Sequence, residues 1–493
     1  MLEVLNKKVA KATKWAAMTE VAAKLVTPII NMVLARLLTP EAFGVVTTIT
    51  MIITFAELFT DAGFQKYLIQ HEFNDENDRE ESTNVAFWSN FAMSFLLWGG
   101  IAVCSDSLAE LVGNPGLGHV VVVSCVSIPL AAFSSIQIAL YKRDFDFKTL
   151  FKVRIVGICI PLFVTIPCAL LFRNYWALII GIISRDVSNA VLLTRYSKWK
   201  PQFFFSTSKL KEMVSFTSWS LVEAVSIWLT QYVDVFVVGT LLSQHYLGLY
   251  KTSTTIVGQM MGMITAATTP ILFSSLSRLQ DDDEDFRKLF LQFQKLVGML
   301  VIPLGLGIFC FSDLITVIFL GEQWMEAAGF IGLWGITSSV AIIYSHYSSE
   351  VYRAKGLPKL SVLAQWLHII VLWPVVLFSV SYGFEVLYTA RAFVRLELIL
   401  VNLFIIYHLI DISPVAMLKN TAHSLCAAFT MMLLASFLRM LGDSIVWQFM
   451  SIVLCILIYF AFILFFKEER ELIVYRLLKK YEGIDCRGFL SSK

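Results

Sequence analysis

The amino-acid sequence predicts an all-α polytopic membrane protein of about fourteen transmembrane helices, and three observations support this fold class. Only 15% of the 493 residues are charged and 57% are hydrophobic, with a mean hydropathy of +0.72. A soluble protein carries about a quarter charged residues. The apolar residues recur in runs of about 20, the length that a helix needs to cross roughly 30 Å of hydrocarbon. Lys and Arg gather in alternate connections between these runs.

The apolar runs place the expected spans in order along the chain. They cover residues 15–36, 42–62, 84–104, 118–141, 153–172, 174–194, 213–241, 246–275, 290–320, 327–350, 359–380, 384–409, 418–438 and 445–466. Because this count is even, both chain ends are expected on the same side of the membrane.

The connections between the spans differ sharply in their basic residues. One alternate set, with the two chain ends, carries Lys7, Lys8, Lys11, Lys14, Lys66, Arg79, Lys142, Arg143, Lys148, Lys152, Arg195, Lys198, Lys200, Lys209, Lys211, Arg287, Lys288, Lys355, Lys359 and the basic residues of 467–493. The other set holds little beyond Arg36, Arg173 and Arg439. Since Lys and Arg are retained on the cytoplasmic face, both termini are predicted to be cytoplasmic.

An internal repeat relates two parts of the chain at an offset of 204 residues. It places the segment 37–45 over 241–249, so that Gly44 falls on Gly248, and it places Trp15 over Trp219. Six spans separate the copies, so the halves are expected to share one orientation, with a substrate path between them. We therefore expect a six-helix bundle in 1–204, a second in 205–412, two extra helices in 413–466 and a cytoplasmic tail in 467–493.

Ionisable side chains inside the spans are the candidates for function. Each costs at least about 2.5–3.5 kcal/mol at the bilayer centre, so it usually faces a bundle interior or an aqueous cavity. The acidic candidates are Glu20, Glu223, Asp234 and, at the end of the second span, Asp61. The cationic candidates are Lys24, Lys251, Arg391, Arg395 and Arg185.

Structural interpretations of some ionisable residues stay open, because neighbouring opposite charges can neutralise one another. The ion pairs to consider are Glu20 with Lys24, Arg185 with Asp186, and Arg395 with Glu397. Cations near span ends are expected to snorkel to the interface rather than to contact a substrate. They are Arg36, Arg154, Lys295 and Arg353.

Several function classes are disfavoured. A net charge of +2, with basic residues dispersed among loops, argues against a nucleic-acid partner. The eight cysteines form no CxxC pair, so we expect neither a disulfide framework nor a metal site. Because the chain carries no P-loop, GxSxG or HExxH motif, it is not expected to be an enzyme or to hold a cofactor. The acidic run from Glu72 to Glu81 is expected to be a solvated loop.

Short motifs in a fixed order give the chain a family resemblance. They are residues 38–44 (LTPEAFG), 59–64 (FTDAGF) with 68–70 (LIQ), 113–115 (GNP), 139–145 (ALYKRDF), 276–282 (LSRLQDD) and 320–324 (LGEQW). With these motifs the sequence resembles the polysaccharide transporter branch of the multidrug/oligosaccharidyl-lipid/polysaccharide exporter superfamily, and within it the Wzx flippases of the colanic acid exporter type. The resemblance runs nearly from end to end.

The resemblance implies two pseudo-symmetric six-helix bundles around a central cavity, plus two C-terminal helices, in the bacterial inner membrane. It implies movement of an undecaprenyl-diphosphate-linked oligosaccharide to the outer leaflet, with H⁺ or Na⁺ as a coupling ion and a polysaccharide polymerase complex and membrane lipids as partners. In similar flippases the cavity is cationic and lined by the first, second, seventh and eighth spans. This points first to Lys24 and Lys251 as diphosphate ligands and to Glu20, Glu223 and Asp234 as groups that bind an ion or tune the charge.

Two other functions remain in view. A drug or cation antiporter of the same superfamily is disfavoured by the excess of cationic cavity candidates and by the two additional helices. A membrane-bound polymerase or glycosyltransferase is disfavoured because the predicted external loops are short and no sizeable soluble region is present.

Overall fold

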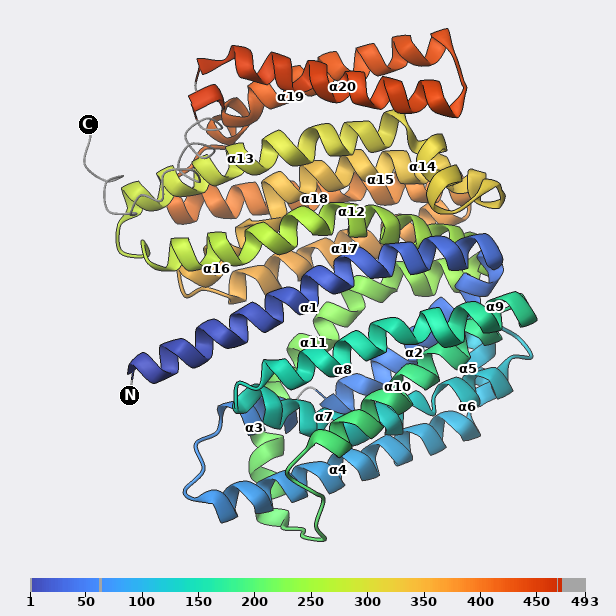
Figure 1. Ribbon diagram of the computed structural model, residues 1–493, viewed down its shortest axis with the longest axis vertical. Helices are drawn as coiled ribbons and strands as arrows, with labels where there is room; N and C mark the ends of the chain where they lie inside the picture. Colours follow the sequence, from blue (N-terminus) through green and yellow to red (C-terminus); the bar gives the residue numbers. More distant parts are fainter. Residues whose placement is uncertain (1, 62–63, 468, 472–493) are drawn as a thin grey trace.

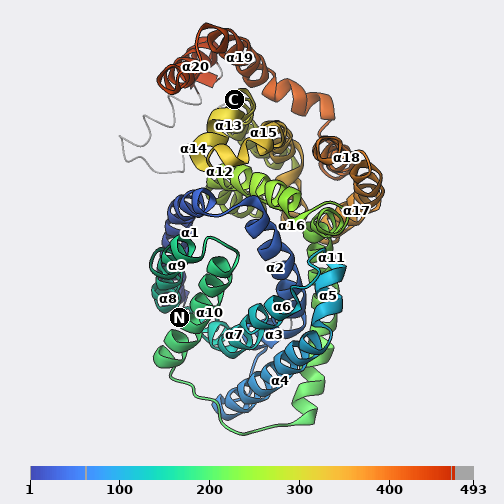
Figure 2. The same cartoon turned by 90° about the vertical axis from the view of Figure 1, so that its right-hand side faces the viewer.

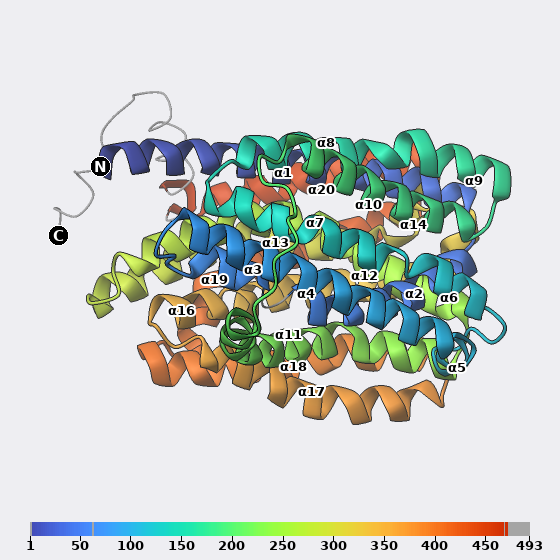
Figure 3. The same cartoon turned by 90° about the horizontal axis from the view of Figure 1, so that it is seen from below.

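The computed structural model describes residues 2–61, 64–467 and 469–471 (Figure 1). This part of the chain contains 14 helical spans long and apolar enough to cross a membrane, and it contains no strand. The predicted fold class is confirmed. The protein is a multi-pass membrane protein whose long helices run side by side along one direction (Figures 1 and 3).

The elements follow one another with short connections. They are α1 (Leu2–Leu37), α2 (Pro40–Asp61), α3 (Phe64–Gln70), α4 (Glu76–Val103), α5 (Ser105–Leu111), α6 (Gly118–Ser124), α7 (Ser127–Arg143), α8 (Phe147–Ile160), η1 (Pro161–Thr165), α9 (Ile166–Phe172), α10 (Trp176–Tyr196), α11 (Thr207–Leu241), α12 (Gln244–Ser277), α13 (Asp283–Cys310), α14 (Ser312–Phe319), η2 (Glu322–Ala327), α15 (Ala328–Ala341), η3 (Ile342–His346), α16 (Ser348–Ala354), α17 (Lys359–Val380), α18 (Phe384–Ile410), α19 (Pro414–Leu441) and α20 (Ile445–Phe465).

The predicted spans differ from the observed helices mainly at their ends. Helix α11 begins at Thr207, whereas its strongly apolar part is Ala224–Leu241. Hydropathy marks only the hydrocarbon-embedded part, whereas helical hydrogen bonding continues into the interface. The predicted ninth span, 290–320, is wrong at its end, because the chain leaves helical geometry at Phe311 and a separate short helix, α14, follows.

Seen along the helix axes, the first bundle (α1 to α10) lies beside the second (α11 to α18), and the α19–α20 pair lies at the outer edge (Figure 2). The extra pair packs on α13, where the Tyr459 hydroxyl donates a hydrogen bond of 2.9 Å to the Met299 carbonyl. Helix α11 contacts both bundles, through α2, α3 and α4 on one side and α17 on the other.

The two bundles meet most closely where α2 and α12 begin, at the end of the molecule away from the N-terminus (Figure 1). A Cβ placed on Gly44 would lie 1.9 Å from the Gln244 carbonyl oxygen, and one on Gly248 would lie 1.8 Å from the Pro40 carbonyl oxygen. These contacts are related by the repeat offset, since Pro40 and Gln244 are also 204 residues apart. Only glycine permits this backbone approach. We call this end of the molecule the glycine end.

Side-chain hydrogen bonds close the glycine end further. The Gln244 amide donates to the Gly113 carbonyl at 2.9 Å, from the second bundle to the first. In the same direction, the Trp324 indole and the Gln323 amide donate to the Ala35 carbonyl at 2.8 and 2.7 Å. The bundles are therefore held together at this end by backbone acceptors, which cannot move independently of their helices.

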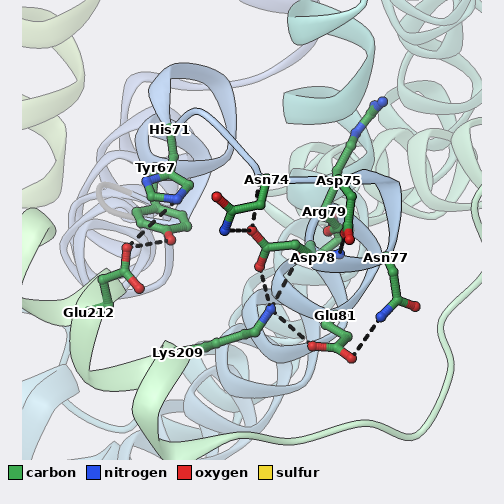
Figure 4. A network of polar contacts seen from close by, with 11 residues as sticks. Tyr67, His71, Asn74, Asp75, Asn77, Asp78, Arg79, Glu81, Lys209 and Glu212 are labelled. Atoms are coloured by element: carbon green, nitrogen blue, oxygen red, sulfur yellow. Dashed lines mark hydrogen bonds and ion pairs between the residues drawn. The ribbon is translucent and has the colours of Figure 1, made fainter.

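At the opposite end, the start of α11 is bound to the first bundle by polar side chains (Figure 4). The Lys209 ammonium lies 2.6 Å from Asp78 and 3.0 Å from Glu81, and the Tyr67 hydroxyl donates to Glu212 at 3.0 Å. Burial alone would lower the pKa of Lys209, but its hydrogen bonds to the two carboxylates raise it.

The interpretation of Glu72 to Glu81 as a solvated loop is therefore wrong for its second half. Asp75 caps the first turn of α4 by accepting from the Asp78 amide at 2.7 Å, and Arg79 bonds Asp144 at 3.0 Å. The acidic residues thus begin a helix and hold α11, because carboxylates are favoured where backbone amides are unpaired.

Candidate functional site

Two cavities lie in the interior of the described structure, one mostly against the first bundle and the other inside the second. The first cavity has a volume of about 630 Å³ and is lined by residues of α1, α2, α8, α10, α11 and α12. The second has a volume of about 570 Å³ and is lined by α12, α15, η3, α16, α17 and α18. Lys251 on α12 lines both.

The lining of both cavities is largely apolar, but all of its charged side chains are cationic. The charged side chains are Arg154, Arg185 and Lys251 in the first cavity, and Lys251 and Arg395 in the second. Among the described residues that line either cavity there is no Asp or Glu. Hydroxyl and amide groups complete the first cavity: Thr27, Asn31, Thr47, Thr50, Asn189, Thr255 and Gln259. Such a wall suits an anion with many hydroxyl groups.

Lys251 is the cation that the two cavities share. Its ammonium lies 5.3 Å from the centroid of the Tyr232 ring, within cation–π distance. In the part of the chain that the structure describes, no carboxylate lies within ion-pair distance of it. Its charge is therefore available to a ligand.

Arg391 is instead paired inside the second bundle. Its Nε lies 2.9 Å from the carboxylate of Asp234, and both residues are buried, with exposed fractions of 8% and 5%. The same carboxylate accepts from the Tyr250 hydroxyl at 2.6 Å and from the Val235 amide at 2.8 Å. Arg391 does not line either cavity, so the geometry gives it and Asp234 a structural role beside the site rather than direct ligand contact.

Arg395 lies one turn further along α18 and reaches the second cavity. Its guanidinium lies 3.9 Å from the Trp334 ring centroid and donates to the Ser338 hydroxyl at 2.7 Å. The alternative that Arg395 pairs with Glu397 is wrong, because Glu397 lies 2.9 Å from His368. Residues two apart on a helix point to different faces.

Arg185 both forms an ion pair and lines the first cavity. Its Nε lies 3.1 Å from the buried Asp186, while 46% of its side chain is exposed. Arg154 was expected to snorkel to the interface, but it lines the same cavity. The sequence feature that marks this position of Arg154 is Gly157, one turn away on α8. In the structure this glycine faces Asn189 and Arg185 of α10.

Lys24 lies next to the second cavity rather than in its lining. A Cβ on Gly262, which does line that cavity, would lie 3.0 Å from the Lys24 ammonium. Glu20 is exposed, and no ion pair joins it to Lys24 in the described structure. The side chains of Asp61 and Glu223 lie outside the residues whose side chains are described.

The cations expected to snorkel have structural partners as well. Arg36 donates to the Ile318 carbonyl at 2.7 Å, across the bundles. Arg353 pairs with Glu350. Lys295 lies 3.1 Å from Glu469, which is only 1% exposed and also contacts His423 at 2.8 Å. Snorkelling is therefore the wrong interpretation for Lys295.

A family model described as "Polysaccharide biosynthesis protein" matches residues 33–329, more than half of the chain. The chain belongs to this family. The expected resemblance to Wzx-type transporters is thereby confirmed at the level of the family.

The curated relatives have low sequence identity to this chain, but the matches cover long parts of both chains. The succinoglycan biosynthesis transport protein ExoT of Rhizobium meliloti (strain 1021) is 21% identical over 68% of this chain and 66% of its own. The lipopolysaccharide biosynthesis protein WzxC of Escherichia coli (strain K12) is 21% identical over 65% of each chain. The teichuronic acid biosynthesis protein TuaB of Bacillus subtilis (strain 168) is 21% identical over 71% of this chain and 72% of its own. The matches thus span about two thirds of these relatives.

Solved structures confirm the fold of this family member. A structure of the lipid II flippase MurJ in an inward closed conformation superposes with a TM-score of 0.72, at 15% identity, over 94% of this chain and 99% of that one. An inward-facing multidrug resistance MATE transporter gives a TM-score of 0.61, at 13% identity, over 81% of this chain and 96% of that one. Both are similar in fold alone.

Proposed function

We propose that the protein is a flippase that moves undecaprenyl-diphosphate-linked oligosaccharide repeat units from the inner to the outer leaflet of the bacterial inner membrane, for surface polysaccharide assembly. One observation carries this proposal: four cations line the two cavities, which share Lys251, and none of the described lining residues carries a carboxylate. A diphosphate needs such cations while it is out of water. The relatives named for succinoglycan, lipopolysaccharide and teichuronic acid biosynthesis support the same substrate class.

The lining supports a proposed role for each part of the substrate. Lys251 is central because it faces both cavities, and it holds the diphosphate with Arg185 and Arg154 on one side and Arg395 on the other. The hydroxyl and amide groups of the first cavity bind sugar hydroxyls. The prenyl chain stays in the hydrocarbon of the bilayer, so no apolar surface of this chain has to be exposed to water. Lys24, beside Gly262, adds positive potential without lining the cavity.

Movement requires that the glycine end opens. We place this end at the outer face and both termini in the cytoplasm, as the basic connections favour. Rocking of the bundles would then separate α2 from α12 and expose the cavities to the outer leaflet. The division of the chain into 1–204, 205–412, 413–466 and 467–493 belongs to the same proposal.

A gradient of H⁺ or Na⁺ would supply the energy. Asp234 is fully engaged by Arg391, Tyr250 and the Val235 amide. This supports a charge-tuning role for Asp234, which leaves Glu20, Glu223 and Asp61 as the acidic candidates for ion binding. A polysaccharide polymerase complex would take up the product.

The test is reconstitution of the purified protein in liposomes with a defined lipid-linked oligosaccharide, scored by accessibility of the sugar to an external lectin. Lys251→Ala should abolish flipping, Lys251→Arg should keep part of it, and Lys24→Ala should weaken it less. Lys419→Ala is the control, because Lys419 is exposed on α19, a helix that lines neither cavity. Normal flipping by Lys251→Ala would refute the proposal.

The alternative is an ion-coupled drug or cation antiporter. An organic cation needs a carboxylate or an aromatic cage in the binding site. The cationic lining therefore disfavours it. If the same liposomes moved an organic cation against a proton gradient and left the oligosaccharide lipid in place, the antiporter would replace the flippase.

A further inference from the structure

An apolar groove lies on the outside of the first bundle, away from both cavities. It has a volume of about 680 Å³ and is formed by α4, α7, α10 and the connection after α10. Its walls include Phe91 and Phe95 of α4, Phe133 of α7 and Val191 of α10. The ring centroids of Phe91 lie 4.9 Å from Phe95 and 5.7 Å from Phe133. The groove is therefore a continuous aromatic surface.

Two cations stand at one end of this groove. Arg195, in the last turn of α10, and Lys200, in the following connection, both line it and are both exposed. Lys200 donates to the Thr194 carbonyl, which leaves two of its three ammonium protons. In the described part of the chain, Arg195 has no carboxylate within ion-pair distance. Its planar guanidinium matches a phosphate group.

The rest of the groove is apolar apart from Thr194, whose hydroxyl is already hydrogen-bonded to the Gln137 side chain at 3.0 Å. Trp98 at the far end already donates its indole N–H to the Val122 carbonyl at 3.0 Å, so its ring presents only carbon. From Phe91 to Trp98 the wall extends about 10 Å along α4, at 1.5 Å per residue. This is space for a hydrocarbon chain whose charged end is at Arg195.

A second lipid-facing hollow shows that a pair of cations is not a general feature of such hollows on this protein. The hollow of about 480 Å³ between α19 and α20 is lined by apolar residues and Ser451, and by no Lys or Arg. Ordinary annular lipid would fill either hollow. Only the groove on the first bundle adds charge complementarity to an anionic headgroup.

We propose that this groove is a binding site for an anionic phospholipid, with one acyl chain along the aromatic wall and the headgroup phosphate at Arg195 and Lys200. Because the site lies outside the bundle, it is independent of the flippase proposal. The bound lipid would brace α4, α7 and α10 against one another.

The test is native mass spectrometry of the full-length, delipidated protein titrated with phosphatidylglycerol or with phosphatidylcholine of the same acyl chains. Phosphatidylglycerol should bind in preference. Arg195→Ala and Lys200→Ala should each reduce that preference about fivefold, since a cation near a lipid phosphate contributes about that factor. The charge-preserving pair Arg195→Lys and Lys200→Arg should keep most of it.

Two controls separate a built site from a charged surface. Lys198→Ala removes an exposed cation of the same connection that does not line the groove, and it should leave the preference unchanged. Val191→Trp should fill the groove and reduce binding of both lipids. Equal loss in Lys198→Ala, or no preference in the wild type, would overturn the proposal. Displacement of phosphatidylglycerol by equimolar undecaprenyl phosphate would overturn it too, because the occupant would then be the carrier lipid.

Discussion

Replacing Gly44 or Gly248 by alanine should force the two bundles apart at the glycine end. The new Cβ would lie 1.9 or 1.8 Å from a backbone carbonyl oxygen, whereas real Cβ atoms essentially never approach closer than 3.0 Å. Each contact is therefore short by more than 1 Å. Since the opposing atoms are backbone, no change of rotamer relieves the clash, and one helix must move away from the other.

The expected cost is about 1–3 kcal/mol, the usual penalty for inserting a methyl group into a packed interface. It opposes the gain of up to about 1 kcal/mol that Gly→Ala brings inside a helix. The clash lies between the bundles, so it penalises the closed arrangement and leaves each bundle folded. A penalty of about 1–3 kcal/mol on the closed arrangement shifts a two-state equilibrium by a factor of about 5 to 150.

The shift can be measured by electron–electron resonance between spin labels at Glu110 and Glu322, which are exposed on opposite bundles at the glycine end. The labels require that the exposed Cys104 and Cys426 are replaced by serine. Gly44→Ala and Gly248→Ala should both move the distance distribution to longer values.

Gly99→Ala is the matched control for the two glycine variants, because nothing lies within 4 Å of its added methyl group. It should leave the distance distribution in place. Unchanged distributions in both interface variants would refute the reasoning.

Three further predictions concern ion pairs that do not line the cavities. Asp234→Asn leaves Arg391 buried without a charge partner and should lower the stability by about 3–5 kcal/mol, measured as a lower thermal midpoint in detergent. Adding Arg391→Met should recover most of the lost stability. A double variant that is no more stable than Asp234→Asn would contradict the pairing. A double-mutant cycle on Lys209 and Asp78 should give a coupling free energy of up to about 1 kcal/mol. A coupling free energy of zero would show that this contact does not contribute to stability. Burial raises the pKa of Glu469, but its hydrogen bonds outweigh this and hold the pKa below the ordinary 4.5. Its stabilisation should be present above that pH and lost below it, and Glu469→Gln should remove this pH dependence of the thermal midpoint.

The spans and the repeat could be predicted because both depend on local sequence. A run of about 20 apolar residues has few alternatives to a membrane helix. The offset that aligns Gly44 with Gly248 was visible as identity, and the structure supplies its cause: each glycine faces the carbonyl four residues before its counterpart.

The pairing of the charges could not be predicted in the same way. Asp234 and Arg391 lie 157 residues apart and meet only because α11 and α18 both belong to the second bundle. Distance to a span end predicts that Arg154 and Lys295 are both interfacial, yet Arg154 lines a cavity and Lys295 pairs with a buried carboxylate. Position along a helix gives depth, whereas the direction of a side chain depends on which helices surround it.

One turn of α12 joins three features of the molecule. Gly248 contacts α2 across the bundles, Tyr250 anchors the turn to the buried Asp234, and Lys251 faces both cavities. Because a helical turn is rigid on this scale, opening the glycine end must either carry Lys251 with α12 or break the bond of Tyr250 to Asp234. The buried network resists the second course, since an unpaired carboxylate out of water is costly. Under the proposed opening, the shared cation therefore moves together with the second bundle, and we expect the first cavity to lose its contact with Lys251.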